Sequence, residues 1–325
     1  MIKPAVSIKF QCVCTSPFHT TQQKYQNLLK CAPYILGTTI RGSILGFLIQ
    51  KYCTDKKIVE LKKMQDSESI VRFHRECERE CIVKEIYQNL DDISYSFGKF
   101  QKKQSMTVTR ISLDRDNKIS SEGSIVNVEC IKEGSEFHFE IILFKNMMAI
   151  KNEIEEAVEY IGKYLGIGKF KSIGFGRFNV INVISEDLTH FLEYDSYNSI
   201  DLNLISVFKT PFIFNIKSMD ENVLIEEISN LIFERYCEIA QEKVDGKIEI
   251  KNLIVEMKPE FIHRYSLEKS KIENRLVMEA GSIFRYQIDN DKIERQIMIA
   301  SRFGIGEWRN CGFGRFNVTD YKAIN

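Results

Sequence analysis

The chain has 325 residues, and its 45 Lys and Arg residues are balanced by 45 Asp and Glu residues. A neutral chain has no overall field that attracts it to nucleic acid, so any basic site must be local. No apolar run approaches the roughly 20 residues that cross a bilayer, and no signal-peptide pattern is present, so we expect a cytoplasmic protein without membrane contact. Nine Cys residues at irregular spacing indicate reduced thiols rather than a disulfide framework.

A glycine-rich block occurs twice, at residues 166–180 and 304–318. Each copy begins Gly-Ile-Gly and ends Gly-Phe-Gly-Arg-Phe-Asn-Val. Between these identical ends an aromatic residue is followed by a cation, as Phe170-Lys171 in one copy and Trp308-Arg309 in the other. The interval between the copies is about one small domain, which predicts two modules of the same kind.

The predicted elements follow the same order in both modules. The first has a strand at 5–14, a helix around 40–49, strands at 106–113, 124–131 and 136–144, a helix at 150–165 and a last strand from about 175. The second has a strand at 206–216, a helix around 223–232, strands at 248–255 and 282–287, a helix at 292–303 and a last strand from about 313. Strand, helix, two strands, helix, strand is the order of a ferredoxin-like α+β fold, in which the central strand pair completes a small antiparallel sheet.

These elements predict a first module at residues 1–190 and a second at residues 200–325, separated by a polar stretch near 185–203. Residues 54–105 are too numerous for a simple connection within the first module. We expect them to form an insertion with a charged helix at about 67–90.

The glycine blocks contain the residue types of an anion-binding loop. Glycines after a helix let backbone N–H groups point into one concavity, a cation adds charge-assisted hydrogen bonds, and an aromatic ring stacks on a base. This combination favours a polynucleotide over a small ion. Alternatively, the glycines only turn the chain. For Phe175, Phe178, Phe313 and Phe316 we expect core positions in the last strand of each module. The sequence contains neither a Walker-type phosphate loop nor a Gly-x-Gly-x-x-Gly motif.

The helix, glycine block and strand together resemble the C-terminal glycine-rich loop of the RAMP superfamily of CRISPR proteins, which are built from ferredoxin-like modules. Three further segments are similar to family motifs. Residues 34–46 contain Gly-Thr-Thr-Ile-Arg-Gly, with Leu36 where the family usually has proline. Residues 109–115 read Thr-Arg-Ile-Ser-Leu-Asp-Arg and are followed by Glu-Gly-Ser at 122–124, and residues 278–284 are similar to a segment that precedes the second helix in two-module members.

The resemblance is greatest to the Cas-five-type subunit of subtype III-D complexes, or of the related type VII. It implies two tandem RRM-like modules, a non-catalytic role in antiviral defence and no cofactor. Such a subunit caps the 5′ handle of the CRISPR guide RNA (crRNA), which is its repeat-derived end, and contacts Cas-seven-type backbone subunits. A large Cas-ten-type subunit or a separate nuclease is a further expected partner.

The candidate RNA-binding residues lie in four segments of the chain. They are Thr38, Thr39 and Arg41; Lys102, Lys103, Arg110 and Arg115; Gly168, Lys169, Phe170, Lys171 and Arg177; and Gly306, Trp308, Arg309 and Arg315. Threonines in the first turn of a helix offer hydroxyl and N–H groups to a phosphate, and the cations suit the RNA backbone. The alternatives are helix capping by the threonines, a solvated surface for the lysines, and a role for the two block arginines in holding their loops.

Two other functions stay open at this point. Some relatives with the same loop are Cas-six-like, metal-independent endoribonucleases that process guide RNA, in which a His takes the proton of a 2′-hydroxyl; His19 is the candidate here. In a purely architectural subunit, the glycine loops would contact protein neighbours instead.

A zinc site is a further possibility, formed by Cys53, His74, Cys77 and Cys81. The last three share a helical face, but the sequence has no tight Cys-x2-Cys pair among them. Buried thiols and a surface His are the alternative.

Overall fold

The computed structural model describes residues 3–25, 27–53, 74, 81–102, 104–113, 120–189, 202–212, 221–241, 251–256, 259–266, 271–288 and 291–320. The longer helices are α1 (Gly37–Tyr52), α4 (Ile82–Gln88), α5 (Lys151–Tyr160), α7 (Glu221–Ala240) and α8 (Asp291–Phe303). In these ranges no helix has the length and apolar character needed to cross a membrane.

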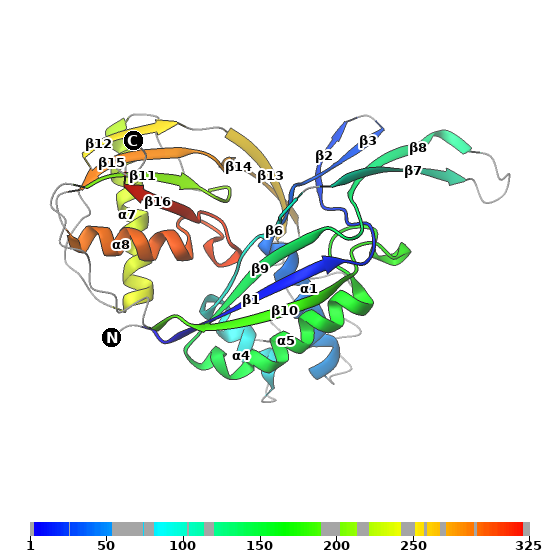
Figure 1. The fold of residues 1–325 in the computed structure, drawn as a ribbon, viewed down its shortest axis with the longest axis horizontal. Helices are drawn as coiled ribbons and strands as arrows, with labels where there is room; N and C mark the ends of the chain where they lie inside the picture. Colours follow the sequence, from blue (N-terminus) through cyan, green and yellow to red (C-terminus); the bar gives the residue numbers. More distant parts are fainter. Residues whose placement is uncertain are drawn as a thin grey trace.

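The first half of the chain forms a six-stranded antiparallel sheet with helices on one face (Figure 1). Its strands are β1 (Ala5–Cys14), β4 (Tyr34–Ile35), β5 (Ile93–Tyr95), β6 (Gly98–Phe100), β9 (Glu136–Phe144) and β10 (Phe178–Asp187). Their spatial order is β10-β1-β9-β6-β4, and β5 also pairs with β9. Helices α1, α4 and α5 lie together against this sheet.

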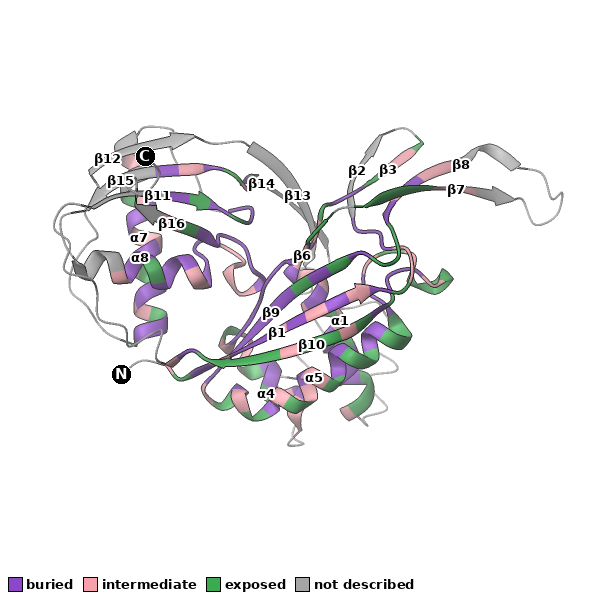
Figure 2. Ribbon diagram, viewed as in Figure 1, coloured by how far each residue is buried: buried purple, intermediate pink, exposed green. Residues whose placement is uncertain are grey.

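The core lies between this sheet and its helices because β1 alternates apolar and polar residues. Ile8, Phe10 and Cys12 are fully buried against α1 and α5, whereas Ser7 and Lys9 belong to the opposite face. Figure 2 shows β1 and β9 largely buried and β10 largely exposed. Burial of each large aliphatic side chain contributes roughly 1.5–3 kcal/mol, so this two-layer core fixes the position of the segments that follow β1 and α5.

The second half has a four-stranded antiparallel sheet, accompanied by α7 and α8 (Figure 1). Its strands are β11 (Leu202–Phe208), β12 (Lys251–Glu256), β15 (Ile283–Ile288) and β16 (Phe316–Asp320), in the order β12-β15-β11-β16. The predicted α+β class with antiparallel sheets is confirmed. In both halves the last strand lies beside the first, and the first lies beside the strand that precedes the last helix.

One predicted strand pair occupies a different place in the fold. Strands β7 (Ser105–Leu113) and β8 (Ser120–Ile131) do not complete the main sheet but form a hairpin beside β2 (Thr21–Tyr25) and β3 (Leu28–Cys31). This separate sheet projects away from the helices (Figure 1). The short strands β5 and β6, which the sequence pattern missed, pair with β9 instead. Alternating polarity identifies a strand but does not select its partner.

The predicted insertion at 54–105 is only partly separate from the fold. Its later part supplies α4, β5 and β6, and Val83, Ile86 and Ile93 are buried in the main core. The described later part of this segment is therefore integral to the core of the first half. Of the charged helix predicted at 67–90, the structure describes His74 and residues 81–90, which include α4.

The two halves share a small apolar cluster. Ile142 and Phe144 of β9 pack with Ile239 of α7 and with Ile299 and Phe303 of α8. The second half also has a hairpin, β13 (Pro259–Ser266) with β14 (Lys271–Met278), which leads into β15 as β7 and β8 lead into β9.

Candidate nucleic-acid interface

The first glycine block forms a closed loop between a π-helical turn (Ile161–Leu165) and β10. Phe170 has a left-handed backbone with φ 62°, and Gly174 and Gly176 follow with φ 91° and 78°. The N–H of Ile167 donates to the carbonyl of Gly176 at 2.9 Å, which closes the loop. A Cβ on Gly176 would lie 2.0 Å from the carbonyl oxygen of Ile167, so the loop requires glycine there.

The second block repeats this conformation. Trp308 has φ 58°, Gly312 and Gly314 have φ 84° and 68°, and the N–H of Ile305 donates to the carbonyl of Gly314 at 3.1 Å. The identical ends of the two blocks therefore encode the same loop. The four phenylalanines at these ends are buried, which confirms the prediction that they are core residues: Phe175, Phe178, Phe313 and Phe316.

Each loop is anchored to the segment that follows the first strand of its half. The N–H groups of Gly176 and Arg177 donate to the carbonyl of Pro17 at 2.8 Å and to the Ser16 hydroxyl at 2.9 Å. The equivalent bonds run from Gly314 to the carbonyl of Pro211 at 2.9 Å and from Arg315 to the Thr210 hydroxyl at 3.0 Å. The sequence reasoning missed this anchor, although Ser-Pro-Phe and Thr-Pro-Phe at 16–18 and 210–212 form a short repeat.

Exposed cations lie on the first loop. Lys169, Lys171 and Arg177 are exposed, and so is Lys102, two residues after β6. The backbone N–H of Lys169 donates to the carbonyl of His19 at 2.9 Å, so the loop is fixed while its charged side chains are on the surface. Cations on a loop of fixed backbone are suited to binding a phosphate backbone. Because the loop is already ordered, binding would restrict only the cationic side chains.

Phe170 connects this loop to the β7–β8 hairpin. Its ring packs with Val128, Cys130 and Phe175, and the guanidinium carbon of Arg110 lies 4.6 Å from the ring centroid. The structure thus brings Arg110 of the predicted Thr-Arg segment to the first glycine block. This contact is a cation–π interaction that holds the guanidinium beside the exposed lysines. Lys103 and Arg115 lie outside the described residues.

His19 is buried beneath the loop. Its side chain is 0% exposed, its Nδ1 lies 2.7 Å from the carbonyl oxygen of Glu129, and its ring lies 5.3 Å from that of Phe170. Burial lowers the pKa of His19, although the Glu129 carbonyl opposes this effect. Gly168 approaches the same segment so closely that a Cβ would lie 2.6 Å from the His19 carbonyl oxygen. In this position His19 joins the loop to β8.

The second loop is enclosed by the first half of the chain. A Cβ on Gly312 would lie 2.7 Å from the carbonyl oxygen of Tyr95, whereas the equivalent Gly174 has open space around it. Trp308 packs at the edge of a cluster that contains Phe97 and Phe313, and its ring lies 5.3 Å from that of Phe313. The aromatic residue of this block is therefore part of a contact between the halves. Gly306 is buried in the same loop.

Arg309 is occupied by an ion pair. Its guanidinium contacts both carboxylate oxygens of Glu238 on α7, with Nε at 3.2 Å from Oε2, and its Nη1 donates to the carbonyl of Gly306 at 3.2 Å. Glu238 also pairs with the buried Arg235 at 2.8 Å. The cation that corresponds to exposed Lys171 thus holds its own loop to a helix.

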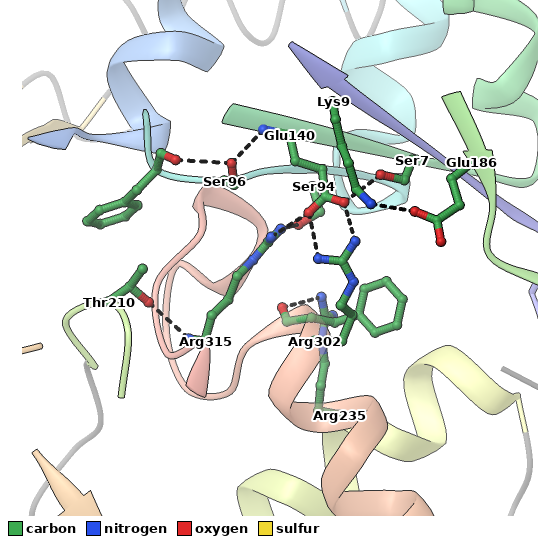
Figure 3. Close-up of polar contacts among 12 residues, drawn as sticks. Ser7, Lys9, Ser94, Ser96, Glu140, Glu186, Thr210, Arg235, Arg302 and Arg315 are labelled. Carbon is green, nitrogen blue, oxygen red and sulfur yellow. Dashed lines mark hydrogen bonds and ion pairs between the residues drawn. The ribbon is translucent and has the colours of Figure 1, made fainter. Parts of the chain in front are cut away.

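Arg315 is buried between the halves, unlike exposed Arg177. It is 8% exposed, its Nη1 lies 2.9 Å from Oε2 of Glu140, and its Nη2 donates to the Ser94 hydroxyl at 3.3 Å. Arg302 of α8 pairs with the same carboxylate, and Ser7 donates to it (Figure 3). Burial alone would raise the pKa of Glu140, but the two guanidinium groups and the Ser7 hydroxyl lower it to about 2. This geometry fits the alternative predicted from the sequence for Arg315, in which the arginine holds its own loop and does not bind RNA.

The start of α1 also contacts the second block. Arg41 is half-buried and its Nη1 donates to the Cys311 sulfur at 3.6 Å. A Cβ on Gly37 would lie 2.2 Å from the Cys311 carbonyl oxygen, so the helix begins against the loop. Thr38 and Thr39 are half-buried residues inside the helix, and the N-cap position belongs to Leu36.

The residues considered for zinc are only partly described. Cys53 is half-buried, His74 stacks on Tyr87 with ring centroids 5.1 Å apart, and the Cys81 sulfur accepts the N–H of Lys84 at the start of α4. Among the residues with described positions, no group of three or more metal-ligating side chains is close enough to hold an ion. Cys77 lies outside those residues, and the zinc site stays a prediction.

Comparison with known proteins agrees with the sequence resemblance. The family model for the RAMP superfamily matches residues 12–179, which is just over half of the chain. A search of curated proteins gave no match. One similar solved structure is a chain of the type III-B Cmr-beta complex bound to cognate target RNA, with 12% identity and a TM-score of 0.39. The match covers 57% of this chain and 61% of that chain, so it spans less than two thirds of the solved chain.

Proposed function

Since the chain belongs to the RAMP superfamily, we propose that it is a non-catalytic, guide-RNA-binding subunit of a CRISPR-Cas effector complex. It holds the repeat-derived 5′ handle of the guide RNA and contacts a Cas-seven-type backbone subunit. The nearest type is the Cas-five-type subunit of subtype III-D or type VII complexes, with a Cas-ten-type subunit or a separate nuclease as a further partner. This finer assignment rests on the presence of two modules and on three motifs: the Arg-Gly helix at residues 34–46, the Asp-Arg strand at 109–115, and Gly-Ile-Gly-Glu-x-Arg at 304–309.

The observation that carries the proposal is the surface around the first glycine block. Lys169, Lys171 and Arg177 are exposed on a loop whose backbone is fixed, and Arg110 is held beside them on the Phe170 ring. Several cations on one rigid surface fit successive phosphates of an RNA strand. The second block adds no comparable surface, because Arg309 and Arg315 are paired with Glu238 and Glu140.

Internal duplication supports a tandem of two ferredoxin-like modules. The segment Gly-Ser-x-Phe occurs at 134–137 and again at 281–284. In both copies its last two residues are the first two of a strand, β9 or β15. In both places the serine carbonyl accepts an N–H from the end of the first strand, from Cys14 at 2.9 Å and from Phe208 at 3.0 Å. With the glycine loops and their anchors, this makes three repeated contacts in corresponding positions.

The non-catalytic role is supported by the position of His19. A general base must come within hydrogen-bond reach of the hydroxyl whose proton it takes, and His19 is fully buried beneath the loop. We therefore favour a binding subunit over a guide-processing ribonuclease.

Binding of repeat-derived RNA to single variants of the full chain tests the proposal. Lys171→Gln removes an exposed cation and is expected to weaken binding by roughly tenfold or less and to reduce the slope of log K against log salt by about 1. Arg309→Gln, at the same position of the other block, is expected to leave the affinity and the slope unchanged. Lys151→Gln, at the far end of α5, is the charge-matched control.

Two results would contradict the proposal. One is equal loss of RNA binding in the Arg309→Gln and Lys171→Gln proteins, or no loss in either. The other is site-specific cleavage of repeat RNA by the purified protein that disappears in His19→Ala, which would make the protein a ribonuclease.

A further inference from the structure

A second basic site lies between the two halves of the chain. A cavity of about 460 Å³ separates the open face of the first sheet from β16, α8 and the segment after β11. Its lining includes Lys9, Lys99 and His138 from the first half, and Lys209, Arg302 and Arg315 from the second. The ion pairs of Figure 3 form one wall of this cavity.

The face of the first sheet changes character along β9. Ile142 and Phe144 are covered by α7 and α8, and Glu140 is buried by the two arginines. Two residues further on, His138 is exposed to the cavity, and its cross-strand partner on β6 is Lys99. On this face of β9, residues 142 and 144 thus make apolar contacts, residue 140 forms an ion pair, and residue 138 lines the cavity.

The charges on the lining do not cancel. Five lining side chains are Lys or Arg and one, Glu140, is a carboxylate. Glu140 is already bound by Arg302 and Arg315, and Lys9 is paired with Glu186. Within the described part of the chain, no carboxylate pairs with Lys99 or Lys209. These two lysines therefore leave excess positive charge in a partly enclosed space.

The lowered pKa values of Lys99, Lys209 and His138 agree with an excess of positive charge in the cavity. Burial, and then the charges of Lys209 and Arg315, lower the pKa of Lys99 to about 8. Burial also lowers the pKa of Lys209, with Arg302 and Arg315 contributing, and burial and Lys99 lower the pKa of His138. Each cation is destabilised by its surroundings, and an anion placed between them would relieve this.

We propose that this cavity binds the phosphate group of a nucleotide, held by Lys99 and Lys209 between the two halves of the protein. The volume lies within the range of pockets for small organic ligands, and inorganic phosphate alone would leave much of it empty. The apolar part of the lining, which includes Ile184, Met298 and Val318, is suited to the sugar and base. This site differs from the surface of the first glycine block, and it does not depend on the function proposed above.

Titration of the full-length protein with adenosine 5′-monophosphate, inorganic phosphate and adenosine tests this site. We expect saturable binding of the monophosphate, competition by inorganic phosphate and no binding of adenosine. The Lys99→Gln/Lys209→Gln variant is expected to lose roughly tenfold in affinity per lysine, because each removes a charge-assisted hydrogen bond to the phosphate. Lys151→Gln, on the helical face of the same sheet, should bind like the unaltered protein.

A second arm distinguishes a free nucleotide from the end of an RNA. A 5′-phosphorylated RNA that displaces the monophosphate, while its 5′-hydroxyl counterpart does not, identifies an RNA end as the ligand; displacement by neither identifies a free nucleotide. Lys169→Gln/Lys171→Gln should leave monophosphate binding intact, which separates this site from the glycine loop. Absence of monophosphate binding at millimolar concentration, or unchanged binding in the double lysine variant, would overturn the proposal.

Discussion

The two glycine blocks share one backbone conformation but lie in opposite environments. In the first, Gly174 faces open space and Lys171 and Arg177 are exposed. In the second, the corresponding Gly312 lies against the backbone of residues 95–97, and Arg315 is buried in an ion pair. Identical residues therefore serve an exposed cationic surface in one copy and an internal contact between halves in the other. The difference comes from the neighbouring elements and not from the loop itself.

The largest expected effect separates the two arginines at the same position. Arg315→Gln removes one of the two guanidinium groups that bind the buried Glu140 carboxylate, together with the donor to Ser94. Because Arg302 still binds Glu140, the expected reduction in the free energy of unfolding is about 3 kcal/mol. Arg177→Gln, at the exposed position, should change it by no more than about 0.5 kcal/mol. Chemical denaturation of both proteins measures this difference, and equal losses would show that the second block is not enclosed as described.

Acid titration of stability tests the same ion pair. Because the folded-state pKa of Glu140 is lowered from 4.5 to about 2, its contribution is fully present above pH 4.5 and is lost as the pH falls toward 2. The contribution is on the order of 2–3 kcal/mol. Glu140→Gln should be less stable at pH 7 and should lack this part of the acid dependence. Glu186→Gln, which breaks the exposed pair with Lys9, is the control and should retain it.

A glycine pair isolates the packing difference from backbone strain. Gly174→Ala and Gly312→Ala both place a side chain at positive φ, which costs about 1 kcal/mol in each case. Only at Gly312 would the Cβ also meet backbone atoms, at 2.7 Å and 2.9 Å, which adds about 1–3 kcal/mol. Thermal unfolding should therefore show a larger loss for Gly312→Ala. A larger loss for Gly174→Ala is incompatible with the structure.

The smallest expected effect has the opposite sign. Lys99→Gln removes a cation that is destabilised by burial and by nearby cations, so the ligand-free protein should become more stable at pH 7, by about 1 kcal/mol or less after allowance for solvent screening. As the pH rises from about 8 toward 10.5, the native Lys99 deprotonates and this advantage should disappear. The facing groups Lys209, Arg315 and His138 remain in both proteins, so comparison of their melting curves isolates Lys99. A less stable variant at pH 7 would mean that the lysine has a stabilising partner.

Sequence patterns predicted the strand that opens the fold and the glycine loops because these depend on local chemistry. Residues 5–14 alternate in polarity, and the structure begins and ends β1 at the same residues. The pairing of β7 with β8 outside the main sheet was not predictable in this way, since Met106 and Ile125 look like strand residues whichever sheet receives them. The short β5 and β6 have only three residues each, too few for a pattern to show.

The sequence by itself determined the superfamily, the two glycine loops and their backbone conformation, because glycine at positive φ and a buried phenylalanine are local requirements. It also marked the first block as the more cationic, with Lys169 where the second has Glu307. Only the tertiary structure decided which arginines are exposed, because Glu140 and Glu238 are distant from their partners in sequence. The phosphate cavity has the same origin: Lys99 and Lys209 are brought to one space by the packing of two sheets, and no motif connects them.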